Sequence, residues 1–515
     1  MRVAPLLFVG MGLAGLLAGA VPATAASPSP APTPRQLDWG PCPDRHEDLN
    51  RAGAQCADVT VPLDHTDPGG RTIQVTISRI KAADPSRRRG ILLSNPGGPG
   101  GAGLDNTLRL RPALGDVADR YDLIGFDPRF LGDSTPVGCA PAAPAVPPGP
   151  VTSARRDFDR SVRAARDTAR RCGRHGDNAA LLPHASSRNV ARDMDAIRAA
   201  LGERRLSYYG VSYGADLGAV YTQLFPGRAD RMVLDSSTDP TATQYELFRS
   251  AGKPLEEALD TWAGWTARRH GAYALGRTAA EVRARVQRLL DRAERRPLSV
   301  AGTRLDAPVL RLVLRQLIQH AEYDAALAGT VRDLVDAAAG KPVEPGPELA
   351  AMLEMLASPE LADSMLGGAV FMCGDGGWPA GGWPADPETY WKNSQRSRTE
   401  QPVFGPFVNG MTAPCAFWET GPAEPGTRIG NDVPALMLQA RHDNNVPYAG
   451  ALALHRRLTG SRLVTADIRA HGVYGRGTDG LRPVPCADRA VNAYLRDGTL
   501  PAHDLTCPAT GGSGR

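Results

Sequence analysis

Ser212 lies in a Gly-x-Ser-x-Gly pattern that joins two segments of different character. An apolar, aromatic-rich run over residues 205–211 leads into it as a strand would, and an apolar helical segment follows over residues 215–225. A sharp turn between strand and helix holds a serine at its tip, and only glycine fits on either side without a Cβ clash. The free N–H groups of the helix would face negative charge that develops beside the serine. The pattern therefore predicts a serine nucleophile.

A serine hydroxyl is a weak nucleophile until a histidine takes its proton and a carboxylate orients that histidine. Asp443 follows a predicted strand over residues 435–440, and His471 follows another over residues 462–468. The interval between the two residues has room for one helix and one strand. The order serine, acid, histidine is that of the α/β-hydrolases. We expect Ser212, Asp443 and His471 to form a catalytic triad.

Two other residues are alternatives for the acid and the base. Asp235 also ends a predicted strand, over residues 231–235, and can serve as the acid. His442 adjoins Asp443, but it precedes the helix and strand that follow, so it cannot easily face the serine. A turn aspartate or a loop histidine would be ordinary alone. The joint match of order, spacing and strand-end position favours the first assignment.

A glycine-rich run over residues 97–103 follows a predicted strand and fits two kinds of site. It satisfies Gly-x-Gly-x-x-Gly with Asp122 and Asp127 downstream, so a dinucleotide site is one interpretation. Such a loop also suits an oxyanion hole, because its N–H groups can approach a carbonyl oxygen closely. The triad elsewhere in the chain favours the oxyanion hole, with Gly98 and Tyr213 as the two N–H donors. On this interpretation we expect no cofactor and no metal ion.

The elements that must position these residues alternate between strands and helices. Strands are expected over residues 57–61, 72–80, 90–93, 121–127, 205–211, 231–235, 435–440 and 462–468, and helices over 154–172, 190–201, 215–225, 308–325, 349–356, 448–458 and 490–496. This alternation is typical of an α/β fold with a doubly wound, mostly parallel sheet. The pattern turns helical over residues 241–430, which predicts an inserted lid between the two parts of the core, residues 39–240 and 431–515.

The N-terminal residues 1–25 have the pattern of a signal peptide. Arg2 supplies a positive charge, residues 6–17 are apolar, and Ala23-Thr24-Ala25 offers a small-residue cleavage site. A membrane anchor is the alternative, which the cleavage pattern disfavours. Residues 26–38 form a Pro-rich spacer or a removable pro-segment. We therefore expect a secreted protein.

The composition is that of a globular protein. The 515 residues include 59 Lys and Arg against 55 Asp and Glu, and 42% are hydrophobic, enough for one large or two medium cores. No basic block with interleaved aromatic residues is present, so nucleic acid is not expected as a partner. After signal cleavage we expect no membrane association. A monomer acting on a peptide or small-molecule substrate is the expectation.

The eight cysteines agree with export. None forms a Cys-x-x-Cys pair, which disfavours zinc ribbons and thiol redox chemistry. An even number in an oxidising compartment predicts four disulfides. Sequence does not fix the connectivity, but sequential pairing is expected because each neighbouring pair of cysteines brackets one local segment. The cysteines in chain order are Cys42, Cys56, Cys139, Cys172, Cys373, Cys415, Cys486 and Cys507.

Several motifs lie toward the two ends of the chain: Asn-Pro-Gly-Gly-Pro-Gly at residues 95–100, Phe-Asp-Pro-Arg at 126–129, Gly-Val-Ser-Tyr-Gly at 210–214, His-Gly at 471–472, and Tyr-Leu-Arg-Asp-Gly-Thr-Leu-Pro at 494–501. Together they resemble the secreted bacterial tripeptidyl aminopeptidases, which are proline-iminopeptidase-like serine peptidases of the α/β-hydrolase fold. The resemblance covers roughly residues 37–510. It implies release of tripeptides from free N-termini, and it carries the triad onto Ser212, Asp443 and His471.

The chain departs from the pattern of this family at four places. Phe130 stands where glycine is usual, Ala470 replaces a glycine before the histidine, Asn444-Asn445 replace Thr-Pro after the acid, and Ala215-Asp216 replace Thr-Tyr after the elbow. None of these changes removes a catalytic group. Phe130 and Asp216 can reshape the site, so the substrate class follows less directly than the reaction class.

An aminopeptidase must hold a protonated amine at a fixed distance from the scissile carbonyl, and a buried ammonium needs carboxylates nearby. The candidates in or near the predicted lid are Asp239, Glu246 and Asp375, each of which can also be a surface charge or a helix cap. Trp378, Trp383, Trp391 and Trp418 can line an apolar subsite or pack in a core. Esterase or amidase action on small molecules is the alternative activity. An exported binding protein with an inactive hydrolase fold is the non-catalytic alternative.

Overall fold

The computed structural model describes residues 37–139, 153–375 and 382–509. The predicted signal peptide, nearly all of the predicted spacer, and Trp378 lie outside the described residues. Within the described ranges, no helix combines the length and the apolar character needed to cross a membrane.

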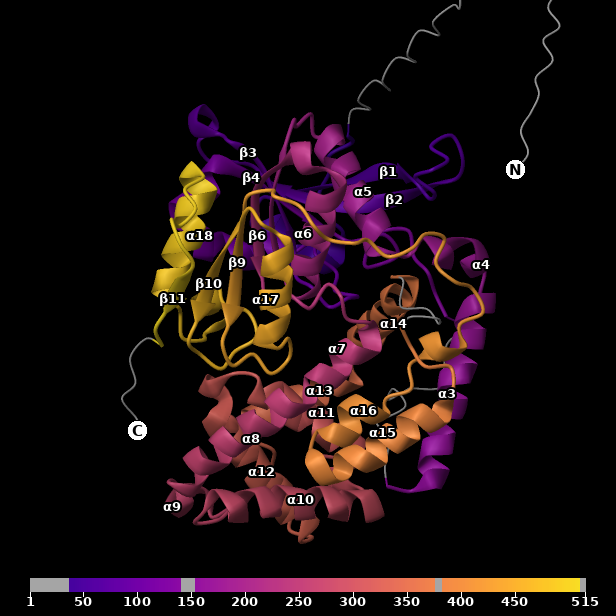
Figure 1. The fold of residues 1–515 in the computed structure, drawn as a ribbon, viewed down its shortest axis with the longest axis vertical. Helices are drawn as coiled ribbons and strands as arrows, with labels where there is room; N and C mark the ends of the chain where they lie inside the picture. Colours follow the sequence, from indigo (N-terminus) through magenta and orange to yellow (C-terminus); the bar gives the residue numbers. More distant parts are fainter. Residues whose placement is uncertain (1–36, 140–152, 376–381, 510–515) are drawn as a thin grey trace, which may run out of the picture. The chain divides into compact units, whose positions relative to one another are not determined.

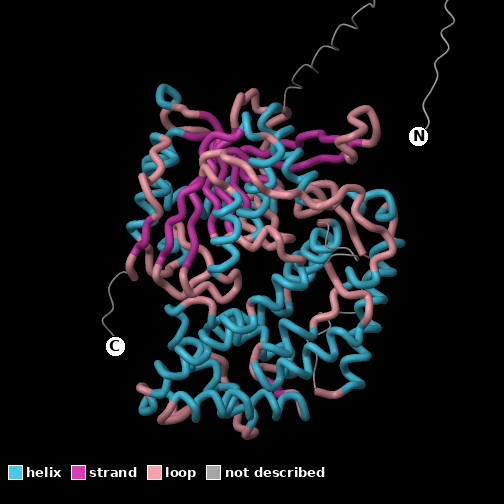
Figure 2. Tube along the Cα trace, viewed as in Figure 1, coloured by secondary structure: helices cyan, strands magenta, loops and turns pink. Residues whose placement is uncertain are grey.

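Nine strands form one sheet in the order β1-β2-β4-β3-β5-β6-β9-β10-β11 (Figures 1 and 2). Their bounds are β1 Gln55–Pro62, β2 Thr72–Ile80, β3 Gly90–Asn95, β4 Tyr121–Phe126, β5 Leu206–Val211, β6 Ala229–Asp235, β9 Ala435–Ala440, β10 Ser461–Ala466 and β11 Leu505–Cys507. From β4 to β11 every neighbouring pair is parallel, and only β2 pairs antiparallel, with β1 and β4. The expected mostly parallel α/β fold is confirmed.

Alternate residues of the central strands enter two separate cores, because successive side chains of a strand point to opposite faces. Leu93 and Tyr208 belong to a core with α5 (Ser187–Ala200), α6 (Tyr213–Leu224) and α17 (Tyr448–Arg457). Their neighbours Leu92 and Tyr209 belong to a second core with α2 (Asn106–Leu114) and α18 (Pro485–Asp497). Both faces of the sheet are therefore covered, as a parallel sheet requires.

Between β6 and β9 the regular elements of the described residues are helices, apart from the short strands β7 (Leu298–Val300) and β8 (Thr303–Leu305) (Figure 1). We call residues 241–430 the insert. Its helices are α7 Gln244–Ser250, α8 Gly252–Ala267, α9 His270–Tyr273, α10 Ala279–Arg295, α11 Ala307–Ile318, α12 Asp324–Ala338, α13 Pro347–Ala357, α14 Pro359–Gly374, α15 Pro387–Glu400 and α16 Gly405–Gly410. Helices α8 and α10 to α13 share an apolar core of their own, in which the Trp262 indole N–H also donates to the Asp324 carbonyl at 3.0 Å.

The tryptophans of the insert have different surroundings. Trp383 is fully buried against Tyr245 and Phe248, and Trp418 is also buried. Both belong to the core that includes α5 and α6. Trp391 packs against Phe158. Core packing, rather than a subsite wall, accounts for Trp383 and Trp418.

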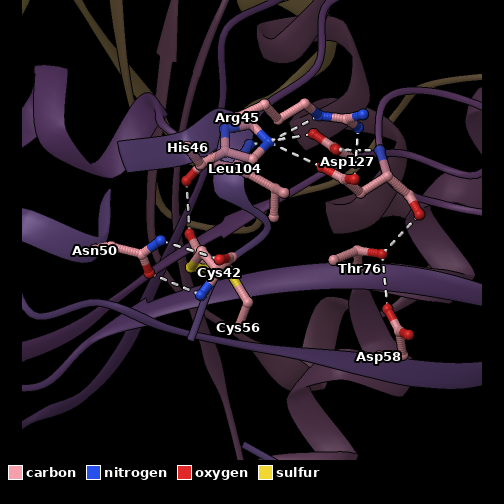
Figure 3. Close-up of a disulfide and its surroundings, with 11 residues drawn as sticks. Cys42, Arg45, His46, Asn50, Cys56, Asp58, Thr76, Leu104 and Asp127 are labelled. Carbon is pink, nitrogen blue, oxygen red and sulfur yellow. Dashed lines mark hydrogen bonds and ion pairs between the residues drawn. A yellow bond between two sulfur atoms is a disulfide. The ribbon is translucent and has the colours of Figure 1, made fainter. Parts of the chain in front are cut away.

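All eight cysteines are paired, as Cys42–Cys56, Cys139–Cys172, Cys373–Cys415 and Cys486–Cys507. The prediction of four sequential disulfides is confirmed. Figure 3 shows the first of them, which joins the segment before the sheet to β1. Beside it the Asn50 side chain accepts from the Cys42 N–H at 2.8 Å and donates to the Cys42 carbonyl at 3.0 Å.

Candidate active site

Ser212 stands in the turn between β5 and α6, with φ 58° and ψ −127°. Residues other than glycine rarely adopt such backbone angles, so the surrounding contacts must hold Ser212 in this conformation. A Cβ on Gly210 would lie 2.2 Å from the Gly214 carbonyl oxygen, and one on Gly214 would lie 2.6 Å from the Asn95 carbonyl oxygen. The two flanking glycines are therefore required by space, and the strand–turn–helix context of the serine is as expected.

His471 and Asp443 lie together. The imidazole Nδ1 is 2.9 Å from the Asp443 carboxylate, which is buried with 2% exposure. The other carboxylate oxygen accepts the backbone N–H groups of Asn445 at 2.8 Å and Val446 at 2.9 Å. These bonds fix the carboxylate, and an imidazole that donates Nδ1–H to it keeps Nε2 free to accept a proton.

Burial and charge act in opposite directions on His471. Burial alone would lower its pKa, but the Asp443 carboxylate and its hydrogen bond outweigh burial, with a smaller contribution from Asp235, and the pKa is raised above 6.5. Such a pairing stabilises the imidazolium that a general base becomes after it takes a proton.

Asp235, the alternative acid, bonds to the loop that follows His471. Its carboxylate accepts the N–H groups of Val473 and Tyr474, both at 2.9 Å, and the Ser236 hydroxyl at 3.0 Å. Its backbone carbonyl accepts the Ser212 N–H at 2.8 Å. Asp235 therefore links the serine turn to the histidine loop, while Asp443 is the carboxylate hydrogen-bonded to the imidazole.

His442, the alternative base, has a side chain that is 62% exposed and lies 3.6 Å from Asp467. The structure does not bring it to Asp443 or to Ser212 by any hydrogen bond among the described residues.

The glycine-rich loop lies directly against the serine turn. A Cβ on Gly97 would lie 2.4 Å from the Val211 carbonyl and 3.0 Å from the Ser212 Cβ. Gly98 follows with φ +122°, a conformation that favours glycine. Within the described part of the chain, the N–H groups of Gly98 and Tyr213 donate to no other residue.

The two acidic residues of the dinucleotide interpretation are engaged in protein contacts. Asp127 is buried and accepts the N–H groups of Gly103 at 2.7 Å and Leu104 at 3.2 Å. Figure 3 shows Asp127 near Leu104. Asp122 accepts the Ala82 N–H at 2.9 Å and pairs with Arg88 at 3.0 Å. Asp127 thus anchors the end of the glycine-rich loop, and neither carboxylate is left for a ribose.

A cavity of about 320 Å³ lies beside the first turns of α6. Its lining includes Tyr213, Asp216, Ser187, Thr238 and Asp375. Asp216 accepts the N–H and hydroxyl of Thr238 at 3.0 and 2.9 Å, and Asp375 accepts the N–H of Ser187 at 2.7 Å. The Ser187 hydroxyl is in turn 2.7 Å from the Tyr213 hydroxyl.

Both carboxylates of this cavity resist ionisation. Burial raises the pKa of Asp216 to about 7, with repulsion from Asp375 adding to the rise, and burial raises the pKa of Asp375 to about 6. Asp375 was among the predicted substrate-binding residues, whereas Asp216 was noted only as a departure from the family pattern. The sequence signal that could have identified Asp216 is an acidic residue in the first turn of an otherwise apolar helix.

The other two predicted acidic residues line a different cavity, of about 220 Å³, together with Asn445 and Val446. Asp239 accepts the Thr241 N–H at 2.8 Å, and the exposed Glu246 caps α7 through Thr243. Asp375 therefore lines a different cavity from Asp239 and Glu246. Those two residues make the local turn and cap contacts that acidic residues commonly make.

The chain is similar to known proteins over nearly its whole length. The model of the α/β hydrolase fold family matches residues 90–317, and that of the TAP-like protein family matches residues 401–507. A tripeptidyl aminopeptidase of Streptomyces lividans is 35% identical, over 92% of this chain and 86% of that protein. The serine protease Hip1 of Mycobacterium tuberculosis is 29% identical, over 92% and 91%. A carboxylesterase B of the same species is 29% identical, over 98% and 97%.

Proposed function

Because the chain belongs to the tripeptidyl aminopeptidase family of α/β-hydrolases and is a serine hydrolase, we propose that it is an exported aminopeptidase that releases tripeptides from free N-termini. The observation that carries the proposal is the hydrogen bond between His471 and a buried, fixed Asp443, on a loop that Asp235 joins to the Ser212 turn.

In the proposed mechanism, His471 Nε2 takes the hydroxyl proton of Ser212 while Ser212 Oγ bonds to the scissile carbonyl carbon. The carbonyl oxygen becomes an oxyanion that the N–H groups of Gly98 and Tyr213 stabilise. His471 then gives its proton to the leaving amine as the C–N bond breaks, which leaves an acyl ester on Ser212. His471 next takes a proton from water as the water oxygen bonds to the ester carbonyl carbon. It returns that proton to the Ser212 oxygen as the ester C–O bond breaks, which releases the peptide as its carboxylic acid. Asp443 orients the imidazole throughout.

The cavity beside Tyr213 supports amine recognition. Asp216 and Asp375 are partly buried, and burial raises their pKa values. A cation stabilises the ionised form of such carboxylates, and a protonated N-terminus is such a cation. We therefore assign the substrate amine to Asp375, the residue predicted for this role, together with Asp216. Asp239 and Glu246, the other two candidates for holding the amine, remain predictions.

Substrate length and amine recognition are tested together with a panel of chromogenic peptides of one to four residues. Each peptide is supplied with a free and a blocked N-terminus, and short-chain nitrophenyl esters are run beside them. Strong preference for free tripeptides is the expected result. Equal rates on free and blocked peptides would instead support the alternative function, an esterase or amidase. The relative named carboxylesterase B is a reason to test that alternative.

Labelling by a serine-directed fluorophosphonate separates an active hydrolase from a binding protein with an inactive fold. Wild-type protein should label and Ser212→Ala should not. Export is supported by the four disulfides and is tested by N-terminal sequencing of protein recovered from the culture medium, with a start after Ala25 or within residues 26–38 expected.

A further inference from the structure

One short stretch of the insert contacts both loops that carry the acid and the base. It comprises residues 315–324, which end α11, include a 3-10 turn over Ala321–Tyr323, and begin α12. We call it the anchor segment. Strand β9 ends at Ala440 and strand β10 at Ala466, so Asp443 and His471 both lie beyond the ladder of the sheet. Contacts outside the sheet must therefore fix these two loops.

The acid loop binds the end of α11 through two consecutive asparagines. The buried Asn444 side chain donates to the Ile318 carbonyl at 3.0 Å, and the Arg315 guanidinium donates to the Asn445 side chain. The backbone N–H of Asn445 is one of the groups that hold the Asp443 carboxylate. The same residue thus contacts the insert with its side chain and the acid with its backbone.

The histidine loop binds the next part of the anchor segment through Arg469. This buried arginine forms an ion pair with Asp324 and donates to the Ala258 carbonyl at 3.3 Å. Its own carbonyl accepts the Ala321 N–H at 3.2 Å. A buried guanidinium is costly unless it is paired, so its attachment to Asp324 strongly restricts the backbone two residues before His471.

A second buried arginine attaches the other side of the histidine loop. Arg476 donates to Glu322 at 2.9 Å, to His320 Nδ1 at 3.1 Å and to the Gly472 carbonyl at 3.3 Å. Burial and the Arg476 charge lower the pKa of His320 to about 4, so this ring is neutral and its Nδ1 can accept. The loop around His471 is therefore held by the insert on both sides and by Asp235 of the core.

Resting on the catalytic roles proposed above, we propose that the anchor segment positions the acid and the base relative to each other, with Asn445, Arg469 and Arg476 as positioning residues that act through Asp443 and His471. Within the described residues, each of the three joins a catalytic loop to the same ten-residue stretch, 315–324. A displacement of either loop by about 1 Å would move the imidazole away from the Asp443 carboxylate or the Ser212 hydroxyl. Such a displacement lowers the rate on the order of 10²-fold.

The test uses Asn445→Ala, Arg469→Gln and, in the insert itself, Asp324→Asn. We expect kcat to fall about 10- to 100-fold with KM within about two-fold of wild type, because the proposed amine contacts, Asp375 and Asp216, are unchanged. The acid limb of kcat/KM should move to lower pH. A looser Asp443 contact opposes the effect of burial less, so the pKa of His471 falls. The other groups that face the ring, the charged Asp235 and Arg315 and the neutral His320, are retained.

Two further variants separate positioning from stability. Arg469→Lys keeps a cation for Asp324 and should recover most of the kcat lost in Arg469→Gln. The matched control is Arg192→Gln, which breaks another ion pair between the core and the insert, with Glu424, at 2.9 Å, that involves neither catalytic loop. The control should keep kcat and the pH limb even if its unfolding midpoint falls. Rates are divided by the concentration of sites that react with fluorophosphonate, so unfolded protein does not count.

Wild-type kcat and an unmoved pH limb in Asn445→Ala, the partly exposed and conservative change, would overturn the inference. So would losses in all three variants that disappear after division by reactive sites. Failure of the proposed function is distinct from either result, because it would appear in the wild-type protein as absence of labelling, or in Ser212→Ala as retained turnover.

Discussion

Ser212 combines a strained backbone with the proposed nucleophilic oxygen. Ser212→Ala removes only Oγ and keeps the Cβ, so φ of 58° and the packing of the turn are retained. We expect turnover to fall about 10⁴-fold or more, with little change in the unfolding midpoint. Steady-state assays at high enzyme concentration and thermal denaturation measure the two quantities. Near-normal turnover would contradict the assignment of the nucleophile.

Matched substitutions to asparagine at Asp443 and Asp235 test which of the two carboxylates is the acid of the triad. Asp443→Asn should lower kcat by about 10³- to 10⁴-fold, because the imidazole loses its charged partner. It should also move the acid limb of kcat/KM to lower pH. The base is active when unprotonated, and loss of Asp443 removes the main influence that raises the pKa of His471. Asp235→Asn should reduce kcat less. The reverse ranking would make Asp235 the acid.

The two partly buried carboxylates beside Tyr213 predict a pH dependence of substrate binding. They are ionised above their pKa values, about 7 for Asp216 and about 6 for Asp375, and protonated below them. KM for free-amine peptides should therefore rise as the pH falls through 7 to 6, while KM for nitrophenyl esters stays constant. Asp216→Asn should raise KM for free-amine peptides about 10-fold or more, whereas Glu257→Gln, a change at an exposed residue of α8, should not.

The site residues that could be predicted from sequence are those with local signals. Ser212, Asp443 and His471 each follow a recognisable strand, and chain order relates them to one another. Asp216 gave a weak signal, and its cavity partner Asp375 is remote in the chain. Arg469 and Arg476 gave none, because a buried arginine has the same letter as an exposed one and their partners Asp324 and Glu322 lie 145 and 154 residues away.

Among the elements, the serine turn has the tightest steric requirement. Gly214→Ala would place a Cβ 2.6 Å from the Asn95 carbonyl and should lower the free energy of unfolding by about 1–3 kcal/mol, with loss of activity. Gly227→Ala is the control, since a Cβ there meets nothing within 4 Å. Urea unfolding measures both. Equal stability of the two variants would show that the turn can relax.

Most helices and strands could be predicted because their apolar periodicity is strong. The predicted helix over residues 308–325 is correct as far as Ile318, and its continuation beyond that residue is wrong. Helix α11 ends at Ile318, His320 is extended, and α12 begins at Asp324. The Ile318 carbonyl accepts from Asn444 and the Ala321 N–H donates to Arg469, so the backbone groups that would continue the helix are bonded to other loops. Apolar spacing carries no information about such partners. The β7–β8 hairpin (Leu298–Val300, Thr303–Leu305) and β11 were not predicted, being only three residues per strand.

At the scale of the whole molecule, the disulfides reinforce separate parts of the fold. Cys373–Cys415 closes the longest loop, with a sequence separation of 42. Replacing both residues by serine should cost about 2–4 kcal/mol of unfolding free energy, chiefly because the unfolded chain regains entropy. Chemical denaturation of the double variant measures this loss. Detection of free thiols in unreduced, denatured wild-type protein would contradict the complete pairing.

The contacts of residues 315–324 also limit how this fold can diversify. Exchange of a peripheral domain between relatives is a direct route to new specificity only when the catalytic groups do not depend on that domain. Here the partners of Asn445, Arg469 and Arg476 would leave with the exchanged segment. A chimaera that receives another protein's residues 241–430 would therefore need the matching residues on its catalytic loops as well, and the two regions are expected to evolve together.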